Sequence, residues 1–120
     1  MPRYLLLLHD SGTMPEGIAP QEIQAIIQRY MTWRKKVEGA GHAVLGHKLR
    51  DGEGRVLRST DGRVSVTDGP YAEAREVVGG LFIIDAANYA EVEALCQDCP
   101  HLAFGAIEIR EIQPTGPAAK

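Results

Sequence analysis

The chain has 120 residues, of which 44% are hydrophobic and 24% are charged, and its formal net charge at pH 7 is -3. This length suits one domain with its own core, and the composition excludes disordered, collagen-like and coiled-coil chains. The charges are scattered and slightly acidic, so we expect no nucleic-acid partner, which would want a basic face. We predict one domain over residues 1–113 and a flexible C-terminal tail over residues 114–120, which is rich in proline and glycine.

Signals for export and membrane anchoring are absent from the sequence. The first apolar run, Tyr4 to Leu8, is shorter than the roughly 7 to 15 residues of a signal-peptide core. No segment approaches the roughly 20 apolar residues that cross a bilayer. We therefore expect a cytoplasmic protein without a membrane partner.

The first predicted elements are a strand, a helix and a second strand. Arg3 to His9 is predicted as a strand, because Tyr4 to Leu8 form an unbroken apolar run of the type seen in strands covered on both faces. Pro20 begins a helix with apolar residues at helical spacing, and Gly39 and Gly41 end it. His42 to Leu49 is the second predicted strand.

A β-hairpin is predicted next. Val56-Leu57-Arg58 lies between Asp51-Gly52-Glu53-Gly54 and Asp61-Gly62. Val64 and Val66 then alternate with polar neighbours. Because Asp-Gly between alternating runs is a strong hairpin signal, we expect a β-ribbon inserted into the domain.

The last third of the chain predicts a strand, a helix and a strand. Gly80 to Asp85 contains a second unbroken apolar run. Asn88, with Glu91 three residues later, predicts a capping box that begins a helix, and Pro100 stops that helix. In the final strand, Gly105 to Ile112, apolar and polar residues alternate.

This order predicts an α+β domain with the split βαβ pattern of the ferredoxin-like fold, in which both helices cover one face of an antiparallel sheet. The runs Tyr4 to Leu8 and Leu81 to Ile84 also place apolar side chains on the other face, which then needs cover. A second copy, packed sheet against sheet about a two-fold axis, provides that cover, so we expect a homodimer.

A specific motif, VTDGPYAE, runs from Val66 to Glu73, and Glu76 and the segment Gly79 to Asp85 follow it. Together they resemble the YCII-related family, in its branch named after an Asp-Gly-Pro-Phe (DGPF) motif. The resemblance extends more weakly over about residues 3 to 112. It implies a dimeric α+β barrel of ferredoxin-like subunits, each with a cleft beside its sheet.

The resemblance does not carry an enzymatic activity with it. Some enzyme-like relatives have a His on the first helix and an Asp immediately before the Pro that ends the second helix, as an acid–base pair. Here the first helix has no His and Cys99 precedes Pro100, so the pair is not matched. Tyr71 replaces the branch's usual Phe, and Ala74-Arg75 its usual Thr-Lys. Branch members mostly have no assigned role, and some are thought to accompany alternative sigma factors.

Asp68 and Tyr71 are the candidate catalytic residues. A structural interpretation explains their motif as a turn, in which Asp68 caps its own turn, Gly69 takes a positive φ and Pro70 fixes the next φ. In the functional interpretation, Asp68, Tyr71 and Glu73 line a pocket where the ribbon rejoins the sheet. There a carboxylate and a phenol bind or deprotonate a small polar ligand.

Five further residues are candidates for ligand binding. Glu108 and Arg110 are expected to point away from the helices and toward the dimer cavity. There they either form a cross-strand or intersubunit ion pair, or Arg110 anchors a carboxylate. His9 and Asp10 end the first strand and His47 lies within the second. These histidines either take part in proton transfer or loose metal binding, or are simply solvated or hydrogen-bonded. No spacing matches a dedicated metal site, so we expect no metal.

Cys96 and Cys99, followed by His101, invite a redox or zinc interpretation. A reactive pair lies at a helix N-terminus, whereas this pair falls on the last turn of its predicted helix. A zinc site needs further ligands. Two buried thiols on an apolar stripe explain the pair. The glycine clusters match no Walker or dinucleotide fingerprint, so we expect no cofactor.

Two functions follow from these residues. The first is a non-catalytic homodimer that binds a small polar molecule or a partner in a cleft between sheet and hairpin. The second is a lyase or isomerase that works by proton transfer, with Asp68 as base, Tyr71 as acid and Arg110 orienting an acid group. A third, an accessory of a sigma-factor regulator, is implied by the resemblance alone.

Overall fold

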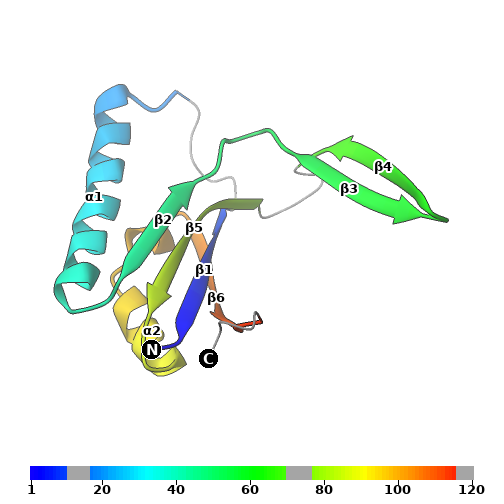
Figure 1. Ribbon diagram of the computed structural model, residues 1–120. Coiled ribbons are helices and arrows are strands. Elements are labelled where there is room, and N and C mark those ends of the chain that lie inside the picture. Colours follow the sequence, from blue (N-terminus) through cyan, green and yellow to red (C-terminus); the bar gives the residue numbers. More distant parts are fainter. Residues whose placement is uncertain (11–16, 70–76, 116–120) are drawn as a thin grey trace.

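The computed structural model describes residues 1–10, 17–69 and 77–115 (Figure 1). Its helices and strands, in chain order, are β1 (Arg3–Asp10), α1 (Pro20–Gly39), β2 (Val44–Lys48), β3 (Arg55–Thr60), β4 (Arg63–Asp68), β5 (Val77–Asp85), α2 (Tyr89–Cys96), the 3₁₀ helix η1 (Pro100–Ala103) and β6 (Gly105–Ile112). Neither α1 nor α2 offers the apolar length that a crossing of the bilayer requires.

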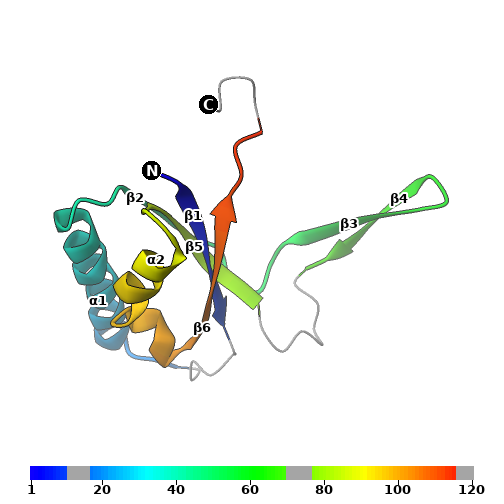
Figure 2. The same ribbon diagram turned by 90° about the horizontal axis from the view of Figure 1, so that it is seen from below.

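The four-stranded sheet has the order β2-β5-β1-β6, and every neighbouring pair is antiparallel. Both helices lie on one face of this sheet (Figure 2). An α+β chain with this order is compatible with the ferredoxin-like fold that the sequence predicts. The hairpin β3–β4 forms a second sheet of its own between β2 and β5 in the chain, as predicted.

The helix-covered face of the sheet carries the core. Tyr4, Leu6 and Leu8 of β1 are at most 7% exposed, and Phe82 and Ile84 of β5 are at most 9% exposed. The helices close this layer with Trp33 and Val37 of α1 and with Val92 and Cys96 of α2. The core is therefore one layer of side chains between a sheet and two helices.

Helix α1 begins at Pro20. Proline suits the first helical position because an N–H there would have no partner within the helix. Ala19, at the N-cap, supplies no side-chain hydrogen bond. Only the C-terminal half of the helix reaches the core. Ile23 and Ile27 are both more than 40% exposed, although they belong to the apolar stripe that predicts the helix.

Helix α2 starts as predicted and ends earlier than predicted. Asn88 Oδ1 accepts a hydrogen bond from the Glu91 N–H at 2.9 Å, and Glu91 Oε1 accepts one from the Ala87 N–H at 2.9 Å. The helix ends at Cys96, not at Pro100. Because a residue before proline avoids the helical region, Cys99 is extended and Pro100 begins the separate helix η1.

The hairpin β3–β4 turns at Asp61 and Gly62, which have φ values of 52° and 78°. Two positive φ values in succession define the type I′ turn that Asp-Gly favours between antiparallel strands. The hairpin, called the arm from here on, projects from the side of the sheet opposite the helices (Figures 1 and 2). The projection raises the radius of gyration to 16.8 Å, against about 14 Å for a compact domain of this length.

Candidate functional site

The sheet has a second face that the helices do not cover, called the bare face. Two rows of directly paired residues cross it: Leu45–Ile83–Leu5–Arg110 and His47–Leu81–Leu7–Glu108. The two rows hold apolar residues on the central strands β1 and β5, and their edge positions are polar apart from Leu45 on β2. Leu5, Leu7, Leu81 and Ile83 are partly exposed, and Leu45 is 46% exposed.

Three polar residues, His9, Glu108 and Arg110, form the charged cluster on the β6 side of the bare face. His9 Nε2 lies 2.8 Å from Glu108 Oε1, and Arg110 Nη1 lies 3.8 Å from Glu108 Oε2. A carboxylate only accepts hydrogen bonds, so His9 Nε2 carries the proton in this contact. The side chains of His9, Glu108 and Arg110 are 22%, 42% and 70% exposed, so a ligand on the bare face has access to all three.

The outward orientation of Glu108 and Arg110 was predicted from the alternation along β6, and the structure confirms it. Ile107 and Ile109, between and beside them, pack against the core on the opposite face. Within the chain, these two residues form only a loose pair along one strand, with 3.8 Å between Arg110 Nη1 and Glu108 Oε2, and the cross-strand or intersubunit ion pair stays a prediction. The shorter contact of Glu108 is to His9, a partner that the sequence does not indicate.

On the other side of β1, a buried hydrogen-bond chain holds the backbone of His9. His101 is 5% exposed, and its Nε2–H donates to the His9 carbonyl oxygen at 2.8 Å. Its Nδ1 therefore accepts from the Tyr30 hydroxyl at 3.0 Å. Burial, with Cys99 and Asp10 nearby, raises the pKa of Tyr30 to about 12. Tyr30 and His101 thus fix the end of β1 that presents the His9 side chain.

Asp10, the last residue of β1, lies over the start of β5. A Cβ atom at Gly79 would approach Asp10 Oδ2 to 2.9 Å, so a larger residue there would push this carboxylate aside. The strands also shift register between Leu8 and His9, just before this contact. The structure therefore places Asp10 next to the β1–β5 bulge and near Tyr30, not beside Glu108 and Arg110.

Asp68 lies at the end of β4, on the arm. Its side chain is 93% exposed and its Oδ1 lies 3.3 Å from Arg55 Nη1. The structural explanation of its motif needs one correction, because Gly69 does not have a positive φ. Gly69 is buried where a Cβ would come within 2.9 Å of Val56 Cγ2, so close packing requires the glycine. Tyr71 and Glu73 lie outside the described residues.

His47 occupies the opposite edge of the bare face. It is exposed on β2, and the row that contains it passes through Leu81 and Leu7 before it reaches Glu108. Three strand spacings separate the two residues by about 14 Å. Within one chain, His47 therefore does not join the charged cluster.

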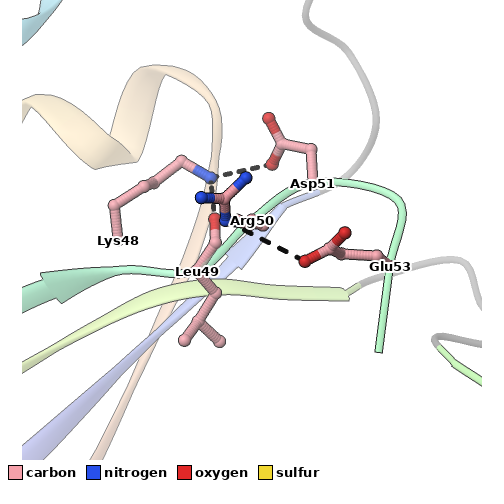
Figure 3. Close-up of a pocket in the computed structure, with 5 residues that line it drawn as sticks. All are labelled: Lys48, Leu49, Arg50, Asp51 and Glu53. Carbon is pink, nitrogen blue, oxygen red and sulfur yellow. Dashed lines mark hydrogen bonds and ion pairs between the residues drawn. The ribbon is translucent and has the colours of Figure 1, made fainter. Parts of the chain in front are cut away.

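A shallow hollow of about 390 Å³ lies where β2 leads into the arm, lined by Lys48, Leu49, Arg50, Asp51 and Glu53 (Figure 3). Lys48 Nζ lies 2.8 Å from Asp51 Oδ1, and Arg50 Nε lies 4.0 Å from Glu53 Oε1. Each cation on its wall thus has an anion beside it. The hollow therefore offers no uncompensated charge to a ligand.

The two cysteines are buried free thiols. Burial raises the pKa of Cys96 to about 12 and that of Cys99 to about 11. Since the thiolate is the reactive and metal-binding form, these thiols are inert near neutral pH. Cys99 lies beyond the end of α2 rather than on its last turn. Across residues 1–10, 17–69 and 77–115, no three His, Cys, Asp or Glu side chains come together in a way that could hold a metal ion.

The chemistry available at the charged cluster is that of an imidazole held by a carboxylate, with a guanidinium beside it. A carboxylate-held imidazole can take up or release a proton, and a guanidinium can bind an acid group in a two-point contact. The cluster joins His9, Glu108 and Arg110 of the predicted site residues. It leaves Asp10, His47 and Asp68 at three other places.

Comparisons with known proteins identify the chain's family. The model of the YCII-related domain matches residues 3–115. A solved structure of the protein At3g17210 from Arabidopsis thaliana is similar over 98% of this chain and 99% of that one, with 13% identity and a TM-score of 0.44. No curated protein matches the sequence. With nearly its whole length matched by the family model, the chain belongs to the YCII-related family.

Proposed function

We propose that this YCII-related protein is a homodimer, packed through the bare face, that binds a small polar molecule between the sheet and the arm. The observation that carries the proposal is the composition of the bare face, where partly exposed leucine and isoleucine rows end in the charged cluster. The Asp68-Gly69-Pro70 motif, with Tyr71 in the place of phenylalanine, supports membership in the DGPF-type branch.

Burial of apolar area supports the dimer. The bare face presents Leu5, Leu7, Leu45, Leu81 and Ile83 as one connected patch. Burying one such side chain fully contributes about 1.5–3 kcal/mol. These side chains are already partly covered by their neighbours, so each contributes a part of that amount. A two-fold axis lets the same patch cover itself, which is the usual geometry of a homodimer.

The charged cluster indicates the chemistry of the ligand. Arg110 is 70% exposed, and its contact with Glu108 is long at 3.8 Å, so its guanidinium remains available to bind a carboxylate of the ligand. Glu108 sits beside it and favours a hydrogen-bond donor. The proposed ligand therefore carries a carboxylate and, a few ångströms away, a hydroxyl or amino group.

The dimer is tested by sedimentation at micromolar concentration. We expect twice the chain mass of 13.1 kDa, and a species at the chain mass itself would overturn the dimer. Ligand binding is tested by a thermal-shift screen of small hydroxy and amino acids, followed by titration calorimetry of the hits.

The matched variants for the ligand are Arg110→Gln and Arg63→Gln. Both remove an exposed guanidinium, but Arg63 lies at the turn end of the arm. We expect Arg110→Gln to weaken a carboxylate ligand at least about tenfold, which corresponds to about 1.4 kcal/mol, and Arg63→Gln to leave it unchanged. Equal effects of the two changes would place the ligand elsewhere.

A second function, proton transfer on such a ligand, is favoured by one contact. The 2.8 Å distance between His9 Nε2 and Glu108 Oε1 is that of a general base with its orienting carboxylate. Turnover of small hydroxy acids, followed by solvent hydrogen exchange at the carbon next to the carboxylate, would show this activity. It should be lost in His9→Asn. Exchange that persists in His9→Asn would remove His9 from the mechanism.

A further inference from the structure

The arm has one apolar face and one polar face. Leu57 pairs directly with Val66, and Ser59 pairs with Val64, so the side chains of Leu57, Val64 and Val66 project on the same side. They are 62%, 65% and 58% exposed. Arg58, Arg63 and Ser65 belong to the other side by the same register.

This arm has little support from its own chain. All six residues of β4 and five of the six residues of β3 are exposed. A two-stranded hairpin is marginally stable at best in water, and three large apolar residues on one side of it are normally covered. We therefore expect the apolar face of the arm to be covered by a surface outside the arm.

The direction and length of the arm indicate where that surface is. The arm extends beyond the bare face, away from both helices (Figure 2). Six residues per strand span about 20 Å. A second sheet packed on the bare face lies about 10 Å away, and its own helices form a layer about 10 Å farther. The arm is thus long enough to pass along both layers of a second copy.

The area of the interface points to the same partner. Four strands of about seven residues give the bare face an area of about 450 Å². A stable interface of standard size buries about 800 Å² on each partner. One face of the arm covers about 200 Å², and in a two-fold dimer each copy both gives and receives an arm. Two arms therefore raise the flat footprint of the contact from about 450 Å² to about 850 Å², nearly twice that of the sheet face alone.

We infer that the arm clasps the second copy of the chain, with Leu57, Val64 and Val66 against the flank of the partner's sheet and helix layers. The exchange is reciprocal, so each subunit is held by its own bare face and by two arms. This inference rests on the proposed homodimer, because a chain that stays monomeric gives the arm no second copy to hold.

The test is the reactivity of a single cysteine placed on the arm. Val64→Cys puts a thiol on the apolar face, and Ser65→Cys, the matched control, puts one on the polar face next to it. The native Cys96 and Cys99 are only 6% and 3% exposed, so a maleimide reagent reports the new thiol. Each variant is labelled as the dimer and in a monomeric background made by Leu45→Asp on the bare face.

We expect Val64→Cys to react at least about tenfold more slowly than Ser65→Cys in the dimer, and at the same rate in the monomer. The double change Leu57→Ser with Val66→Ser should also raise the Kd of the dimer at least about tenfold. A dimer with equal labelling rates would overturn the clasp and leave the sheet interface standing. A wild-type chain that sediments as a monomer would overturn both. Slow labelling at position 64 in the monomer would also overturn the clasp, because the arm would then be covered by its own chain.

Discussion

The two faces of the four-stranded sheet are built from the same strands and the same types of residue, yet they differ in cover and in polar content. On the helix side, Tyr4, Leu6 and Leu8 are buried, and the one buried polar side chain among the described residues, His101, has both ring nitrogens bonded. On the bare side, Leu5 and Leu7 stay partly exposed next to the charged cluster. The residues of β1 that stabilise the fold therefore lie on one face of the strand, and the reactive side chains of the charged cluster lie on the other.

The largest expected effect on stability comes from truncating a leucine on the helix-covered face of β1. Leu6→Ala removes a side chain that is 0% exposed, and we expect it to lower the free energy of unfolding by about 2–5 kcal/mol, since it leaves a cavity. Leu5→Ala, its neighbour on the bare face, should cost less than about 1.5 kcal/mol in dilute monomer. Urea unfolding of both variants measures the difference. Equal costs at low concentration would mean that the bare face is already closed within one chain.

The second prediction concerns the polar groups on the buried side. Tyr30→Phe leaves His101 Nδ1 without its donor in a buried site, so we expect a loss of about 1–3 kcal/mol. The control is Tyr89→Phe, because the Tyr89 hydroxyl accepts the Glu111 N–H at an exposed position. That change should cost less than about 1 kcal/mol. If Tyr30→Phe is as mild as the control, the Tyr30–His101 contact does not hold the end of β1.

The third prediction is the dependence of stability on alkaline pH. The pKa of Tyr30 is raised from 10.0 to about 12 and that of Cys99 from 9.0 to about 11 in the folded chain. The unfolded chain therefore releases these protons at lower pH. Their contribution to stability is complete below pH 9 and falls as pH rises from about 9 toward 12. Chemical unfolding at pH 8, 9, 10 and 11 should show this decline. Above pH 10 the decline should be shallower in Tyr30→Phe.

The smallest effect on stability is expected on the bare face. Glu108→Gln alters a contact between side chains that are 22% and 42% exposed. We expect a change in the free energy of unfolding within about 0.5 kcal/mol, as for other solvent-screened ion pairs. The same change should reduce ligand binding, which thermal-shift measurements with and without ligand would separate. A loss of several kcal/mol would mean that Glu108 is part of the fold rather than of the site.

The elements with strong local signals were predictable from the sequence. The final strand, Gly105 to Ile112, has the predicted bounds because its alternation is clear. The Asp61-Gly62 pair predicts a hairpin turn, and both residues have the positive φ values that this turn needs. The end of α2 was placed too late because Cys99 continues the apolar spacing of the helix beyond Cys96, where the helix ends. Proline disfavours the helical conformation of the residue before it, and Cys99 is accordingly extended rather than helical.

The candidate site was predictable only in part. Alternation places Glu108 and Arg110 on the bare face, because side chains on a strand point to opposite faces in turn. The contact between His9 and Glu108 depends on which strands become neighbours and in which register. The same is true of the contact between Tyr30 and His101, which are 71 residues apart. Such pairings are set by tertiary packing, and no local pattern encodes them.

The pairing of β2 with β5 has a consequence for how the domain tolerates change. Lys48, the last residue of β2, already pairs with Gly80 of β5, and the Leu49 N–H donates to the Gly79 carbonyl oxygen at 3.0 Å. The pairing of β2 with β5 is therefore complete up to the point where the chain leaves the sheet for the arm. Insertions and deletions within the excursion between these two strands leave every ladder of the four-stranded sheet in place. The four-stranded sheet thus sets no limit on the length of the arm, and under the proposed clasp that limit comes from the second copy alone.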